Sequence, residues 1–174
     1  NNLVAHKRAR RGISRSFQIP KPFTSMTVKQ NLLIPLEYAV NTDQLDGLSI
    51  HQQANQILES LEMTDKADQL TSGLTQIEMR KLELARAMAL KPKLLISDEA
   101  MAGLSSSEVD DILKILIELN ENTKITIIMI EHIMRAVMSF SERVVCLDAG
   151  KIIANGTPDQ VIKNTDVEKA YLGE

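Results

Sequence analysis

The sequence predicts an α/β protein in which a parallel sheet carries an attached, mainly helical subdomain. Two observations support this fold class: apolar runs alternate with helical segments in the carboxyl-terminal half, and few strand-like runs occur in the first ninety residues. The apolar runs are Leu94–Ser97, Ile125–Glu131 and Arg143–Leu147. Such alternation is typical of βαβ units in a parallel sheet. At 174 residues, the chain is long enough for one domain with a core.

Local signals place the individual elements in order. A short strand is predicted over Ile13–Phe17, and apolar residues at helical spacing predict helices over Ser49–Met63 and Thr75–Leu90. Ser105 forms a capping-box pattern with the glutamate three residues later, which predicts a helix over Ser105–Asn120. This helix is predicted to carry one apolar stripe, made of Val109, Ile112, Leu113, Leu116 and Leu119. The last predicted elements are a turn at Asp148-Ala149-Gly150 that leads into a hairpin strand at Lys151–Ala154, and short helices at Thr157–Asn164 and Val167–Leu172. The helix breakers of the first half are Pro20, Pro22, Asn41–Gly47 and Thr71–Gly73.

Composition and charge are those of an ordinary globular protein. Hydrophobic residues make up 44% of the chain, charged residues 25%, and the formal net charge is -3, which argues against disorder and against general nucleic-acid binding. The basic cluster His6–Arg11 lacks interleaved aromatic residues, so a solvated helix face is favoured there over nucleic-acid or anionic-lipid contact. The apolar stretch Ile125–Ile130 is far shorter than the ~20 residues that span a bilayer, so we expect a cytosolic chain. The single cysteine, Cys146, excludes an internal disulfide framework.

Polar side chains follow three of the predicted strands at their carboxyl ends, where open α/β sheets bind ligands. Asp98 and Glu99 close one strand, His132 follows the next, and Gln18 follows the strand near the amino terminus. Two adjacent carboxylates suit phosphate chemistry, because one can hold Mg²⁺ while the other orients and deprotonates a water molecule. The alternatives are a strand that ends in a solvated acidic turn and a histidine with a structural role.

Five segments occur together in one order and spacing, and each alone would be a weak signal. They are FQIPKPFTSMTVKQNLLIPL (Phe17–Leu36), RKLELARAM (Arg80–Met88), LLISDEAMAGL (Leu94–Leu104), IEHIMRAVM (Ile130–Met138) and ANGTPDQVIKNTDVEKAYLGE (Ala154–Glu174). With these segments the chain resembles the nucleotide-binding subunit of ABC transporters, and most of all the ATP-binding subunits of branched-chain amino acid importers. The resemblance implies a P-loop NTPase-like parallel-sheet core, with ATP and Mg²⁺ as cofactors.

The resemblance also implies a role for each residue of the rim. Gln18 is similar to the Q-loop glutamine, which senses the metal and the γ-phosphate. Asp98 looks like the Walker B aspartate on Mg²⁺, and Glu99 looks like the catalytic base. His132 looks like the switch histidine that contacts the γ-phosphate. Ser105 stands in the stretch that resembles the D-loop of the dimer interface, at a position where many relatives have aspartate.

The signature loop LSGGQ of the family is altered in this chain. Counting back from the basic pair aligns it with Leu74-Thr75-Gln76-Ile77-Glu78, so both glycines are replaced. The resemblance implies that Thr75, Gln76 and Ile77 approach a nucleotide held by the partner subunit. Because Ile77 has a branched side chain in place of glycine, we expect weak ATP-driven dimer closure. A rival alignment on Thr71-Ser72-Gly73 stands three residues too early.

The sequence contains no GxxxxGK[ST] motif, and its seven glycines are scattered. The family carries this phosphate-binding loop upstream of the Q-loop, so we expect residues 1–174 to be a single, truncated and incomplete ABC nucleotide-binding domain that is inactive alone. Within it we expect a mainly helical subdomain over residues 19–90, an α/β core over residues 91–156, and carboxyl-terminal helices over residues 157–174.

The function implied by the resemblance is ATP hydrolysis that energises import of a small solute, such as a branched-chain or related amino acid. The implied partners are a second ATP-binding subunit, with which the chain forms a dimer, and transmembrane permease subunits. No contact with nucleic acid or with the solute itself is expected, and the expected location is cytoplasmic, on the inner face of the plasma membrane. The alternatives are a non-catalytic interaction module and an ABC ATPase that acts outside transport.

Overall fold

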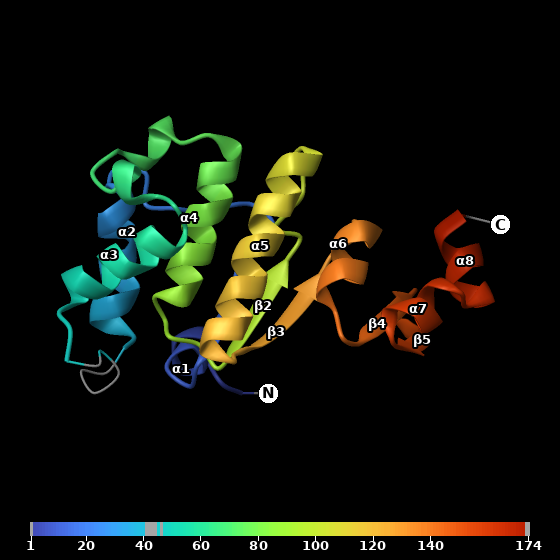
Figure 1. Ribbon diagram of the computed structural model, residues 1–174. Coiled ribbons are helices and arrows are strands. Elements are labelled where there is room, and N and C mark those ends of the chain that lie inside the picture. Colours follow the sequence, from blue (N-terminus) through green and yellow to red (C-terminus); the bar gives the residue numbers. More distant parts are fainter. Residues whose placement is uncertain (1, 41–44, 46, 173–174) are drawn as a thin grey trace. The chain divides into compact units, whose positions relative to one another are not determined.

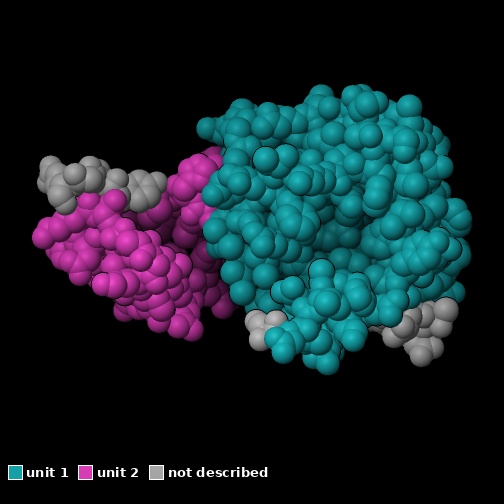
Figure 2. All heavy atoms as spheres, turned by 180° about the vertical axis from the view of Figure 1, so that it is seen from behind, with its two compact units in different colours: residues 1–130 teal, residues 131–174 magenta. Residues whose placement is uncertain are grey.

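The chain folds into two compact units that divide between Ile130 and Glu131 (Figure 2). The computed structural model describes residues 2–40, 45 and 47–172. The predicted breaker Asn41–Gly47 therefore lies largely outside the described residues. The division at residue 130 falls inside the predicted α/β core, and the assignment of residues 19–90, 91–156 and 157–174 to separate parts stays a prediction.

A parallel sheet forms the centre of the first unit. Its strands are β1 (Ile13–Arg15), β2 (Leu94–Asp98) and β3 (Thr126–Ile130), in the order β1-β2-β3. Both pairs are parallel. This confirms the predicted parallel strands around residues 94–97 and 125–131. Because the strands are parallel, their carboxyl ends share one edge, which is where the candidate site lies.

Helices accompany this sheet in the first unit and cover one of its faces (Figure 1). They are α1 (Ala5–Ala9), α2 (Val28–Tyr38), α3 (Ile50–Ser60), α4 (Gln76–Met88) and α5 (Ser106–Thr123), with short 3-10 turns η2 (Thr64–Lys66) and η3 (Thr71–Gly73). Ser97 of β2, Leu84 of α4 and Ile112 of α5 line one small cavity, so α4 and α5 cover the same face of the sheet. On the far side of α4 from α5, α2 and α3 contact each other and α4.

Each of the four long helices of the first unit begins with a capping box, in which the cap side chain and the side chain three residues later bond to each other's backbone. The pairs are Thr27 with Gln30, Ser49 with Gln52, Thr75 with Glu78, and Ser105 with Glu108. The predicted starts at Ser49, Thr75 and Ser105 are thus confirmed. The apolar stripe predicted along α5 is also buried.

The second unit contains a hairpin and short helices. Its elements are α6 (Met134–Phe140), β4 (Val144–Asp148), β5 (Lys151–Gly156), α7 (Pro158–Ile162) and α8 (Thr165–Leu172). Ala149 and Gly150 form the turn with positive φ angles of 43° and 80°, which suits a two-residue hairpin loop. Ala154, Val161 and Val167 make a small core against which Cys146 packs. The predicted hairpin and closing helices are confirmed.

The pairing predicted for the third apolar run is wrong. Its strand is confirmed as β4, but β4 pairs antiparallel with β5 rather than as a member of the parallel sheet. The two-residue turn brings the next strand back at once, so the backbone groups of β4 find partners in their nearest neighbour along the sequence. Among the described residues, no helix is both long and apolar enough to cross a membrane.

Candidate functional site

Asp98 and Glu99 lie at the carboxyl edge of the parallel sheet. Asp98 is the last residue of β2, and Glu99 follows with a φ of 46°. This left-handed conformation is uncommon for a residue with a side chain and turns the chain sharply. The backbone N–H of Glu99 donates to the carbonyl of Ile130, the last residue of β3, at 2.9 Å. Glu99 is therefore anchored to the neighbouring strand at the edge where ligands bind.

Gln18 contacts this acidic pair from the loop after β1. Its side-chain Nε2 donates to Oε2 of Glu99 at 2.6 Å. The predicted gathering of Gln18, Asp98 and Glu99 on one rim is thus confirmed, because their strands end side by side. The amide and the carboxylates therefore offer oxygen ligands and a base at one place on the rim, although Gln18 and Glu99 are 81 positions apart in the chain.

Asp98 is paired with a cation that the sequence analysis did not single out. Arg15, the last residue of β1, donates from Nη2 to Oδ2 of Asp98 and forms an ion pair with it. The backbone N–H of Asp98 donates to Oγ of Ser16 at 3.3 Å. The Asp98 carboxylate is thus paired with Arg15 at the end of β1, and its backbone N–H is bonded to the residue that follows β1.

Arg80 is a second residue that sequence reasoning missed. Its guanidinium is buried and donates to the carbonyls of Phe17 and Gln18, and to the carbonyl of Ala102 at 3.0 Å. It therefore fixes the backbone of the glutamine loop and the turn after Glu99 to one helix, α4. A signal was present in the sequence: Arg80 precedes buried Leu84 by one helical turn, so a charge stands on an apolar helix face.

A buried carboxylate holds the segment that follows Gln18. Glu83 of α4 accepts from the backbone N–H of Lys21 at 3.2 Å and from Nη1 of Arg86 at 2.6 Å. Arg86 in turn donates to the Lys21 carbonyl at 2.9 Å, and its guanidinium carbon lies 5.2 Å from the centroid of the Phe23 ring. These contacts attach the proline-bounded loop to α4 and leave Phe23 at its surface.

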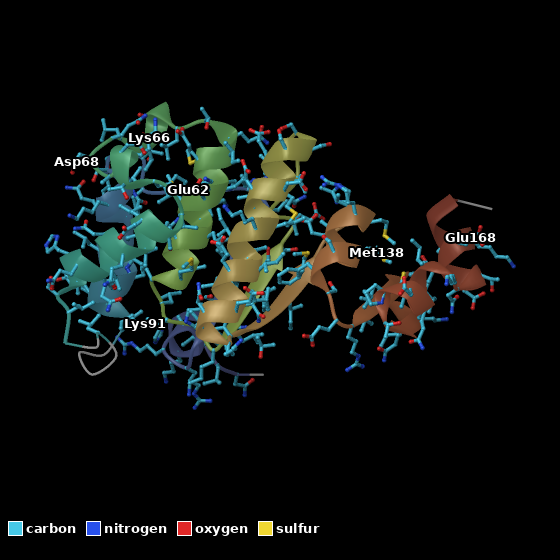
Figure 3. All side chains as sticks on the ribbon, viewed as in Figure 1. Glu62, Lys66, Asp68, Lys91, Met138 and Glu168 are labelled. Atoms are coloured by element: carbon cyan, nitrogen blue, oxygen red, sulfur yellow. The ribbon has the colours of Figure 1, made fainter. Side chains whose placement is uncertain are left out.

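The predicted signature residues lie at the start of α4, where Thr75 caps the helix. The Thr75 N–H donates to Oε2 of Glu78 at 2.8 Å, and the Glu78 N–H donates to Oγ1 of Thr75 at 3.4 Å. Glu78 also pairs at 3.3 Å with Lys66, which Figure 3 labels. The hydrogen bond from the Thr75 backbone, helped by Lys66, holds the pKa of the Glu78 carboxyl below its usual range. The negative charge of Glu78 is therefore directed back onto the cap and a lysine.

Gln76 connects the start of α4 with the turn after Glu99. Its Nε2 donates to the carbonyl of Ala102 at 3.4 Å. Gly103 has a φ of +79°, a backbone conformation that favours glycine at this turn. Ile77 follows in the first turn of α4. Ser105 is occupied as the cap of α5, with its Oγ donating to Oε2 of Glu108 at 2.6 Å.

His132 belongs to the second unit of the chain. It lies two residues beyond the end of β3 and precedes α6. Its predicted place on the rim with Gln18 and Glu99 stays a prediction.

The pKa of Glu78 predicts how stability changes in acid. Because the folded pKa of Glu78 is below its usual range, the stabilisation from ionised Glu78 is present above the unfolded pKa and is lost as the pH falls through the folded pKa. We expect Glu78→Gln, which keeps an acceptor for the cap, to flatten the fall in unfolding free energy below about pH 5.

Urea unfolding of the first unit between pH 6 and pH 3 measures this effect. Glu37→Gln, at an exposed position of α2, serves as the control for the loss of one carboxylate. Equal slopes for Glu78→Gln and the unchanged chain would show that the cap and Lys66 do not favour the charged form.

The oxygen donors of the rim fit a magnesium ion that arrives with phosphates. No group of three or more histidine, cysteine or acidic side chains that could hold a metal occurs among the described residues. Mg²⁺ is usually bound through one or two carboxylates, with phosphate and water completing its shell. Asp98, with 18% of its side chain exposed, and the Gln18 amide match that requirement. They supply only part of the metal's shell, and water or phosphate oxygens would complete it.

Comparison with known proteins shows which family the chain belongs to. The family model described as ABC transporter matches residues 2–102. The chain is 37% identical over 183 residues to the high-affinity branched-chain amino acid transport ATP-binding protein BraF of Pseudomonas aeruginosa, covering 99% of this chain and 72% of BraF. It is 36% identical over 172 residues to the lipopolysaccharide export system ATP-binding protein LptB of Haemophilus influenzae, covering 99% of this chain and 70% of LptB.

A solved structure has the same fold. It is the crystal structure of the ADP conformation of an ATP-binding cassette of an ABC transporter, with a TM-score of 0.84 and 28% sequence identity. The match covers 100% of this chain and 73% of that chain. The sequence, the parallel sheet with its helical attachment and the rim of Gln18, Asp98 and Glu99 therefore agree: the chain belongs to the ABC transporter family and has the α/β fold of its ATP-binding cassettes.

Proposed function

We propose that this chain is an ATP-binding and ATP-hydrolysing subunit that energises import of a small solute, a branched-chain or related amino acid. The observation that carries the proposal is the hydrogen bond between Gln18 and Glu99 beside Asp98 at the carboxyl edge of the sheet. The name of BraF supports the amino acid as cargo. LptB, at nearly the same identity, is named for lipopolysaccharide export, so the cargo needs its own transport assay.

Each rim residue has a task in this proposal. Asp98 and the amide oxygen of Gln18 would hold Mg²⁺, and bound Mg-ATP would supply the phosphoanhydride that is hydrolysed. Glu99 would accept a proton from the attacking water. Its backbone bond to β3 keeps Glu99 in one place for this task. His132 contacts the γ-phosphate. These assignments rest on the family resemblance together with the strand-end placement of the carboxylates.

A second ATP-binding subunit would face the start of α4. In this proposal Thr75, Gln76 and Ile77 approach the nucleotide of that subunit, and Ser105 lies at the dimer interface. The capping box supports the idea, because it leaves other N–H groups of the first helical turn free to face outward. The contact of Gln76 with Ala102 would transmit the position of this helix to the turn beside Glu99.

The 174-residue chain is expected to bind Mg-ATP weakly and to hydrolyse none above background. It has no GxxxxGK[ST] motif, and the backbone N–H groups and lysine of that loop normally hold the phosphates. A hybrid in which the phosphate-binding loop of a family member precedes Asn1 is expected to bind Mg-ATP and hydrolyse it. Titration calorimetry and phosphate release measure the two properties.

The variant Asp98→Asn is the matched control in the hybrid, because it keeps the shape of the side chain and removes its charge. It should lower the dependence of ATP binding on Mg²⁺. Micromolar Mg-ATP binding by the 174-residue chain would contradict the first expectation, and a hybrid that neither binds nor hydrolyses ATP would contradict the proposed function.

Permease subunits are the proposed membrane partners, and they would place the chain at the inner face of the plasma membrane. The segment Pro20–Val28 is the proposed contact. Phe23 is 44% exposed although it is held by Arg86, and Ile19, just before this segment in the chain, is also exposed. Exposed apolar side chains on an anchored loop are suited to receive an apolar helix of a partner.

Cysteine crosslinking tests this contact in the assembled transporter. With Cys146 replaced by alanine, we expect Phe23→Cys to crosslink to a cytoplasmic helix of the permease. Tyr38→Cys, on the exposed end of α2, is the control and should give no such product. Equal crosslinking from both positions, or none from position 23, would exclude this segment as the docking surface.

A further inference from the structure

We propose that Arg15 competes with the metal ion for Asp98, so that it acts as a built-in counter-cation that must leave before Mg²⁺ can bind. This inference rests on the proposed function, in which Asp98 is a metal ligand. It adds a residue that sets how readily the metal site is occupied.

Strand register brings the two charges together. Arg15 of β1 lies opposite Ile96 of β2 in the parallel pair. Side chains alternate along a strand, so Asp98, two residues after Ile96, projects on the same face as Arg15. The neighbours on the other face, Ser14 and Ser97, are buried. Arg15 and Asp98 are therefore diagonal neighbours on one sheet face, a separation that a long arginine side chain spans.

Exposure makes the ion pair exchangeable. The side chain of Arg15 is 53% exposed, and that of Asp98 is 18% exposed. Ion pairs between side chains that reach solvent are weak, so Arg15 can be displaced by a competing cation. Its guanidinium carbon also lies 5.8 Å from the centroid of the Phe17 ring, which can retain the arginine after it releases Asp98.

The surrounding backbone stays in place during this exchange. Arg80 holds the carbonyls of Phe17 and Gln18, and the Ser16 N–H donates to the Ile96 carbonyl at 2.9 Å. The backbone of residues 16–18 is thus held by Arg80 and β2, and the side chain of Gln18 is held by Glu99. Only the arginine side chain needs to move. Glu99 is bonded instead by the neutral amide of Gln18. Arg15 therefore pairs with Asp98 and not with Glu99.

Metal binding to the 174-residue chain tests the inference without ATP turnover. Mn²⁺ is the probe, and line broadening of backbone amide resonances around Asp98 in NMR spectra reports its binding at low ionic strength. We expect Arg15→Ala to bind Mn²⁺ about two- to fivefold more tightly, the range that corresponds to loss of one exposed ion pair. Arg15→Lys, which retains the charge, should stay close to the unchanged chain.

Two controls separate the possible causes. Arg11→Ala removes one positive charge two residues before the start of β1, away from Asp98 in the strand. It should leave the affinity for Mn²⁺ unchanged. Asp98→Asn should abolish the local broadening. Equal affinities for Arg15→Ala, Arg11→Ala and the unchanged chain would overturn the competition while leaving the metal site intact. If Asp98→Asn leaves the broadening unchanged, Asp98 does not bind the metal, and both the metal site and this inference would be overturned. Amide resonances remote from the site report whether each variant is folded. Arg15→Gln, which also removes the charge, serves as a second variant.

Discussion

The variant Glu99→Gln is expected to lower ATP turnover by a factor of about 10²–10⁴ while nucleotide binding is preserved. That range is typical for loss of a general base. Glutamine has nearly the same shape as glutamate, and its side-chain oxygen can still accept from Gln18 Nε2. The backbone bond from position 99 to Ile130 does not depend on the side chain. The variant therefore removes proton acceptance and little else.

The hybrid that carries a phosphate-binding loop is the protein in which this is measured. Phosphate release gives the turnover, and titration calorimetry gives the affinity for Mg-ATP. Glu121→Gln, on the exposed face of α5, is the matched control and should behave as the unchanged hybrid. Turnover within a few-fold of the unchanged hybrid would show that Glu99 is not the base.

The second large effect is expected from the core. Leu116 of α5 is 1% exposed and lines the small cavity shared with Arg80 and Ser97, directly behind the rim. We expect Leu116→Ala to lower the free energy of unfolding of the first unit by about 2–5 kcal/mol, because the surrounding side chains close the resulting void only partly. Urea unfolding followed by circular dichroism measures the loss.

Ile117 provides the matched control, since it is the next residue of the same helix and is 37% exposed. Ile117→Ala makes a similar truncation and a similar change in helix propensity, but much of its side chain already contacts water. We expect a loss well below that of Leu116→Ala. Equal losses would mean that α5 does not pack on the sheet through its predicted apolar stripe.

Local elements were predictable because their causes lie within a few residues. The capping boxes at Ser49, Thr75 and Ser105 each join residues three apart, so the helix starts could be placed without tertiary information. The rim followed from a general rule, that carboxyl ends of parallel strands share an edge. Gln18, Asp98 and Glu99 were therefore predicted together from their positions after strands.

The contacts that the sequence analysis missed join residues far apart in the chain. Arg15 meets Asp98 across 83 positions, and Arg80 meets the Gln18 carbonyl across 62. Such partners depend on the register between β1 and β2 and on how α4 packs, and neither leaves a periodic trace in the sequence. The placement of β4 in the parallel sheet was wrong for a related reason, since an apolar strand can form either kind of ladder.

The sequence by itself determined the α/β class, the helix starts, and the set of polar residues at the strand ends, because these depend on spacing and on side-chain type. Only the tertiary structure decided which cation holds Asp98 and which helix fixes the glutamine loop. It also showed that Lys66 pairs with Glu78. The physical reason is that a charge or a carbonyl bonds to whichever group the packed chain brings within about 3 Å, and packing is a property of the whole unit rather than of any segment.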